Sequence, residues 1–120
     1  MRRGDAEYNA ARDAMLEILI DWVSRPYVPL YYSHLSELLA RQGHKVPPHE
    51  GPMRLLLDDC SRIHSDGPEP LLSAVVVLKG DEVPSSGFYK LARSAPFRRE
   101  GDDQEIWIKE LRKLEGYIGR

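Results

Sequence analysis

The chain has 120 residues, 17 basic and 19 acidic, and one cysteine. This length fits a single domain, residues 1–120, whose core is large enough to need no disulfide or metal. One cysteine excludes an intrachain disulfide and is typical of a reducing, cytoplasmic location. The net charge of −2 gives no global attraction for nucleic acid or anionic lipid, so such binding has to come from a local patch. No apolar run approaches about 18 residues, so we expect no membrane span, and the start MRRGDAEYNAARD becomes acidic and polar where a signal peptide is apolar, so we expect no signal peptide.

The first predicted element is an amphipathic helix from Asp5 to about Ser24. Its apolar side chains recur at the spacing of one helical face, namely Ala11, Met15, Ile18, Leu19, Trp22 and Val23. Leu16 and Ile20 widen this apolar stripe, so the helix has surface for a second neighbour in the chain or for another copy. A symmetric copy is the commonest way to cover such a surface, and we expect a homodimer.

Two further helices are predicted before the middle of the chain. Pro26 and Pro29 end the first helix and keep the next residues extended. Ser33 is a suitable N-cap for a second helix that ends at Gly43. A third helix is expected over about residues 48–64, where one face carries Met53, Leu56, Leu57, Cys60 and Ile63.

The second half of the chain begins with eight uncharged residues, Leu71–Leu78, that include three consecutive valines. This pattern predicts a strand covered on both faces. A turn follows, and residues 88–95 are short enough to form either one or two turns of helix or a second strand. Asp102, with Glu105 three residues later, predicts the capped start of a C-terminal helix. The apolar face of that helix carries Trp107, Leu111, Leu114 and Ile118.

Three helices followed by a strand and a turn is the order of a winged helix-turn-helix. The expected fold is therefore α+β and mostly helical, a winged-helix-like domain with a small sheet of two or three strands and an added C-terminal helix. Within residues 27–80, YYSHLSELLARQG and PHEGPMRLLLDDCSRI resemble the helix-turn-helix of alkyltransferase-like DNA-repair proteins. The Pro-Cys-His-Arg run with which those transferases attack is absent, so the resemblance implies DNA reading without alkyl transfer.

A second resemblance lies in the block PLLSAVVV…VPSSGFY. It is similar to a segment of small uncharacterised bacterial and phage proteins, in which PLLSALVV precedes a proline-glycine turn and GFF or GFY. The resemblance implies a family without an established activity. From the residues alone, Gly87 allows a sharp turn, and Phe88 and Tyr89 return to the core.

Residues 86–99 form the basic stretch of the sequence, with four positive charges and no acid. Such a stretch can hold phosphates while an aromatic ring stacks on a base. The alternative is a solvated loop neutralised by the acidic run at residues 100–105, and this charge dipole also suits docking on a protein. In the third helix, Asp58 and Asp59 accompany the arginines, a mixed face unlike that of a groove-reading helix. The candidate binding residues are Arg54, Arg62, Tyr89, Lys90, Arg93, Arg98 and Arg99.

Catalytic, cofactor and metal patterns are not found in the sequence. His44 and His49 are separated by a Pro-Pro link that does not favour closure on one ion. Cys60 falls on an apolar helical face, and Ser73 lacks the glycines of a nucleophile elbow. We therefore expect a non-catalytic binding module, a DNA-binding or nucleoprotein accessory domain from a bacterium or phage. The alternative is a protein-interaction module, a phage or defence-system protein that docks on a host factor or self-associates.

Overall fold

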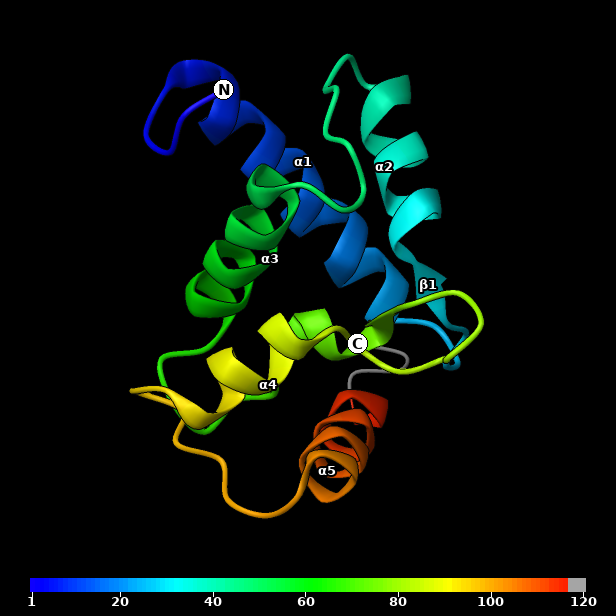
Figure 1. Cartoon of the computed structure of the whole chain (residues 1–120), viewed down its shortest axis with the longest axis vertical. Coiled ribbons are helices and arrows are strands. Elements are labelled where there is room, and N and C mark those ends of the chain that lie inside the picture. Colours follow the sequence, from blue (N-terminus) through cyan, green and yellow to red (C-terminus); the bar gives the residue numbers. More distant parts are fainter. Residues whose placement is uncertain (117–120) are drawn as a thin grey trace.

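The structure of the protein is a computed structural model, and it describes residues 1–116. Helices make up most of this part of the chain (Figure 1): α1 (Ala6–Val23), α2 (Tyr32–Arg41), α3 (Gly51–His64), α4 (Ser86–Arg93) and α5 (Asp103–Glu115). The other elements are the strands β1 (Leu30–Tyr31) and β2 (Val76–Val77) and a 3-10 turn, η1 (Leu72–Val75). The expectation of a mostly helical α+β fold with a small sheet is confirmed.

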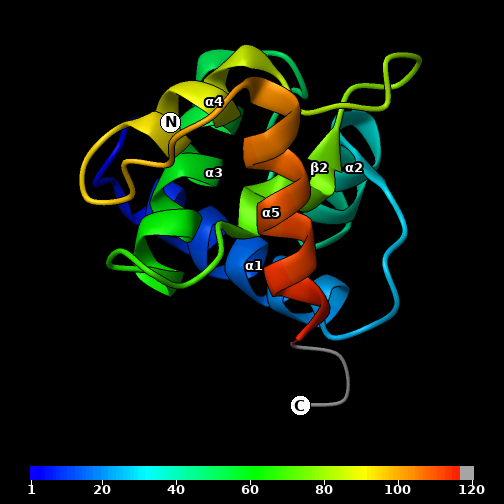
Figure 2. The same ribbon diagram turned by 90° about the horizontal axis from the view of Figure 1, so that it is seen from below.

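The centre of the core is the segment Leu71–Val77, in which every residue is buried. Its η1 turn contacts α1, α3 and α5, and Figure 2 shows α5 lying across the molecule in front of this region. Trp107 of α5 donates its indole N–H to the Ala74 carbonyl over 2.8 Å. The segment is thus enclosed by helices on several sides.

The strand predicted for Leu71–Leu78 is wrong in its geometry and right in its burial. Leu72–Val75 form the 3-10 turn, and the pairing extends only over Val76 and Val77. A continuous apolar run identifies a segment covered on all sides, but its periodicity does not distinguish a strand from another buried conformation. Here the surrounding helices, and not a sheet, provide the cover.

The sheet of residues 1–116 is a single parallel pair, in which Leu30 is opposite Val76 and Tyr31 is opposite Val77. A wing would instead be an antiparallel hairpin. From β2 the chain passes through residues 78–85 and then forms α4. The sequence allowed either a helix or a second strand for residues 88–95, and the structure has a helix there as far as Arg93.

The helix boundaries follow from local chemistry. Helix α2 begins at Tyr32, one residue before Ser33, where the N-cap was predicted. Beyond its end, Gly43 has φ +88° and adopts the left-handed conformation that glycine favours. Pro52 lies in the first turn of α3, where its missing N–H costs no hydrogen bond. The predicted cap of α5 is confirmed, because the Asp102 side chain accepts from the Glu105 N–H over 2.9 Å. Ile118 lies outside the described residues.

Two apolar side chains depart from the predicted faces. Ile63 was expected on the buried face of α3, and it is 53% exposed. The buried neighbour of Cys60 in that turn is instead Ser61, which lies on the other side of the helical face and bonds to Ser73 of η1 over 3.0 Å. Cys60 is buried as expected, and burial raises the pKa of its thiol to about 12.

In α1, Leu16 packs against the core and Ile20 remains exposed. No helix within residues 1–116 combines the length and the apolar character that crossing a membrane requires.

Candidate binding site

Helices α3 and α4 lie side by side and run in the same direction (Figure 1). Near their starts, the Arg54 side chain lies against Gly87, where an added Cβ would come within 3.1 Å of the arginine Nε. Near their ends, Arg62 donates to the Ala95 carbonyl over 3.0 Å and reaches the Ser94 Oγ at 3.5 Å. The two arginines therefore bridge the same pair of helices at two points.

Charged side chains gather along this line of contact. Arg54, Asp58 and Arg62 stand one helical turn apart on α3, and Lys90 is an exposed residue of the neighbouring α4, three positions after Gly87. We call Arg54, Asp58, Arg62 and Lys90 the basic strip, three cations against one carboxylate. Burial raises the pKa of the Asp58 carboxyl, and the charges of Arg54 and Arg62 act in the opposite direction.

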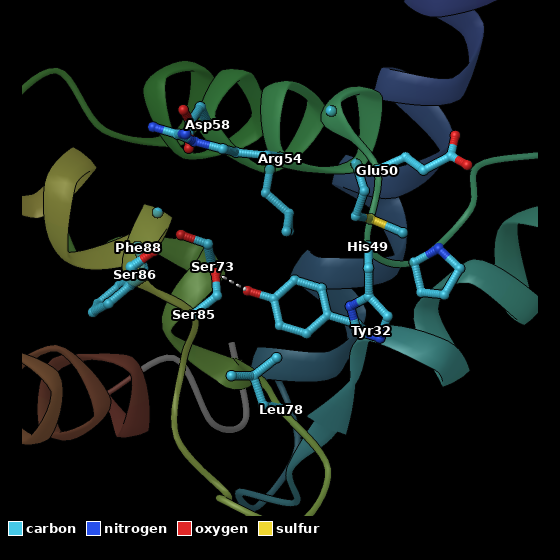
Figure 3. A pocket seen from close by; sticks show the side chains of 15 residues that line it. Tyr32, His49, Glu50, Arg54, Asp58, Ser73, Leu78, Ser85, Ser86 and Phe88 are labelled. Carbon is cyan, nitrogen blue, oxygen red and sulfur yellow. Dashed lines mark hydrogen bonds between the residues drawn. The ribbon is translucent and has the colours of Figure 1, made fainter.

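A pocket of about 250 Å³ opens where α3 and α4 begin (Figure 3). Arg54 and Asp58 extend from α3 on one side, and Tyr32 extends from the start of α2 on the other. Ser73 of η1, and Ser85 with Phe88 at the start of α4, form the remaining wall. The pocket thus joins four segments that are distant in the sequence.

Hydroxyl groups line the inner part of the pocket. Ser73 is 4% exposed and Tyr32 is 7% exposed. The Ser73 N–H donates to the Ser61 Oγ, and this hydroxyl in turn donates to the Ser73 Oγ over 3.0 Å. The Tyr32 hydroxyl pairs with the Ser85 Oγ over 2.9 Å. Burial of the Tyr32 ring raises the pKa of its hydroxyl, so it stays protonated at neutral pH.

Local structure explains these positions. Pairing of β1 with β2 places Tyr32 at the first turn of α2, next to the chain that leaves β2. Ser85 is the N-cap residue of α4, and its side chain makes no cap bond because its Oγ is paired with Tyr32. Gly87 has no side chain, and this leaves room for Arg54 between the helices.

Three of the seven candidate residues lie on the basic strip, namely Arg54, Arg62 and Lys90. Arg93 instead binds the Asp103 carboxylate over 2.8 Å and the Gly101 carbonyl. Arg98 is exposed, with φ +47°, and Tyr89 is half-buried with its ring against Phe88.

Arg99 is used inside the protein. Its guanidinium binds Glu110 over 3.1 Å, and Glu110 is itself buried at 1% exposure. It also donates to the Gly67 carbonyl over 2.7 Å and to the Glu69 carbonyl over 2.8 Å. We therefore leave Arg99 out of the candidate interface.

The sequence analysis did not identify Tyr32, Ser73 and Ser85 as site residues. The last two belong to the PLLSAVVV…VPSSGFY block, which was interpreted as a support for the core. The sequence shows Ser73 and Ser85 in that block, but only the tertiary fold brings the two serines to one pocket.

Comparison with protein-family models, curated proteins and solved structures finds no match to this chain.

Proposed function

We propose that the protein is a non-catalytic nucleic-acid-binding module that contacts duplex DNA with the basic strip. The observation that carries this proposal is that Arg54 and Arg62 of α3 reach the start and the end of α4, the helix that carries the exposed Lys90. Phosphate contacts from lysine and arginine supply most sequence-independent affinity for DNA. A protein with a net charge of −2 needs such a local group of cations.

The arginines of the strip are positioned before any ligand binds. The Arg62 guanidinium lies 5.6 Å from the centre of the Phe97 ring and is bonded to the Ala95 carbonyl. An arginine has five N–H donors, so further donors remain for phosphate oxygens. Holding the side chain in place reduces the conformational entropy that is lost on binding.

The order helix, strand, helix, helix, strand is shared with winged-helix domains, and we propose that α4 takes the place of the wing. The bases would not be read by α3, since its exposed side chains include Leu55 and Ile63, and its Asp59 is bonded to Tyr8 of α1. The proposed contact is therefore to the DNA backbone and tolerates many sequences.

The test is a fluorescence-anisotropy titration of a labelled duplex with the double variant Arg54→Ala, Arg62→Ala. The matched control is Arg25→Ala, Arg41→Ala, which removes two exposed arginines, one just beyond α1 and one at the end of α2. We expect the strip variant to lose about tenfold or more in affinity and the control to bind like the parent, since each lost contact involves a charged phosphate. Equal losses in both variants would contradict the proposal.

The alternative function, a protein-interaction module, is favoured by the exposed apolar side chains Ile20, Val28 and Ile63. Self-association through α1 is the form that the sequence predicts, and it stays a prediction. Sedimentation equilibrium of the parent and of Ile20→Lys tests it, because a dimer through α1 would dissociate in the variant. A constant monomer mass for both proteins would exclude this dimer.

A further inference from the structure

The pocket where the basic strip begins presents hydrogen-bond donors from its inner walls. Since Ser61 donates to Ser73, the hydrogen of the Ser73 hydroxyl is left for another acceptor. Only one hydrogen lies between the oxygens of Tyr32 and Ser85, so this pair also keeps one to donate. Two nearly buried groups therefore offer hydrogens to whatever enters the pocket.

The start of α4 adds donors to the same space. The Phe88 N–H donates to the Ser85 carbonyl, and the Ser85 side chain does not cap the Ser86 and Gly87 N–H groups that precede it in the first turn. The Arg54 guanidinium lies against Gly87 in this first turn. Within the described chain, no carboxylate is within ion-pair distance of that guanidinium. The charge and the helix end both favour an anion.

Two acids, Glu50 and Asp58, also line the pocket. The Glu50 side chain extends away from Tyr32 and Ser73 in Figure 3. Asp58 is closer to the arginines, and its carboxylate opposes a bound anion. Removing the Asp58 charge should consequently strengthen anion binding and weaken the binding of a cation.

We propose that this pocket holds the terminal phosphate of a nucleic-acid strand, next to the basic strip that contacts the backbone. The inference rests on the proposed function. A terminal monoester has three free oxygens and a charge of about −1.5 to −2 at neutral pH. An internal phosphodiester has two free oxygens and a sugar on each side, so it accepts fewer hydrogen bonds from the donors of the pocket. The pocket has a volume of about 250 Å³. A water molecule occupies about 30 Å³ in the liquid, so the pocket has room for a group larger than one water.

The experiment compares two duplexes of one sequence, one with 5′-phosphates and one with 5′-hydroxyls, in competition for the full chain. We expect the phosphorylated duplex to bind about tenfold more tightly at equal salt. This difference in affinity corresponds to about one or two additional charge-assisted hydrogen bonds. Tyr32→Phe with Ser73→Ala should remove this preference and leave the affinity for the hydroxyl duplex unchanged. Asp58→Asn should increase the preference.

A second measurement localises the site independently of DNA. Inorganic phosphate, titrated into the 15N-labelled protein, should shift the amide resonances of Ser86 and Gly87 in the parent. In the Arg54→Ala variant these shifts should be lost, while a matched Arg41→Ala variant keeps them.

The outcomes separate the two proposals. Equal binding of both duplexes, or a preference that persists in Tyr32→Phe with Ser73→Ala, would overturn the terminal-phosphate site and leave the nucleic-acid function standing. A preference that falls in Asp58→Asn would also overturn it. Binding of neither duplex would refute the function and this inference together.

Discussion

Arg98 and Arg99 are adjacent and chemically identical, yet the fold gives them different roles. Arg98 is exposed, whereas Arg99 is bonded to Glu110 and to carbonyls of the segment before the buried core. Glu110 also accepts the Leu71 N–H over 3.0 Å, so the ion pair joins α5 to that segment. The basic stretch could be located from the sequence, but the difference between the two arginines could not. The difference arises because Arg99 is bonded to Glu110, which lies on α5.

Replacing Arg99 should therefore act on stability. Arg99→Ala leaves the Glu110 carboxylate buried without its arginine, and we expect a loss of about 3 to 5 kcal/mol in the free energy of unfolding. Arg98→Ala is the matched control and should change it by no more than about 0.5 kcal/mol. Urea denaturation of both variants measures the difference. Similar urea midpoints for Arg99→Ala and Arg98→Ala would show that the ion pair of Arg99 with Glu110 does not stabilise the fold.

Asp58 gives a prediction about pH. Its pKa is raised in the folded protein, first by burial, so the ionised carboxylate is less favourable in the folded than in the unfolded chain. This cost is present above the folded pKa and disappears as the pH falls below the ordinary value. Asp58→Asn should raise the melting temperature at about pH 7 and leave it nearly unchanged at about pH 3. A lower melting temperature at neutral pH would mean that Arg54 and Arg62 outweigh the burial.

At the scale of the elements, the sequence predicts helices well where apolar spacing and caps agree. Helix α1 and the Asp102 cap of α5 were found in this way. The segment Leu71–Val77 was recognised as buried, but its 3-10 turn was not. A run of apolar residues has no periodicity that would identify the backbone conformation. The conformation is set by the elements that surround the segment, which are α1, α3, α5 and β1.

The burial of this segment can be tested by Val76→Asp. An unpaired carboxylate there costs several kcal/mol, against a typical total stability of about 5 to 15 kcal/mol. We expect the variant to lose cooperative thermal unfolding. Val28→Asp is a suitable control because Val28 is 57% exposed. A variant Val76→Asp that melts like the parent would show that the segment is not the centre of the core.

At the scale of the whole molecule, the candidate site depends on how distant segments meet. The serine-containing block, the tyrosine at the start of α2 and Arg54 of α3 converge because α4 packs beside α3. Arg54 and Arg62 were predicted as candidates in the third helix, and Lys90 was predicted in the basic stretch after the strand. The parallel course of α3 and α4, which joins them, is a tertiary feature that no local pattern in either helix predicts.

The most direct test of the account is the salt dependence of duplex binding by the parent protein. If Arg54, Arg62 and Lys90 each neutralise one phosphate, a plot of log K against log salt concentration should have a slope of about −3. In the variant Arg54→Ala, Arg62→Ala the slope should fall to about −1. A parent that shows no binding at about 50 mM salt, or a slope that is the same in parent and variant, would contradict the assignment of the basic strip as a nucleic-acid interface.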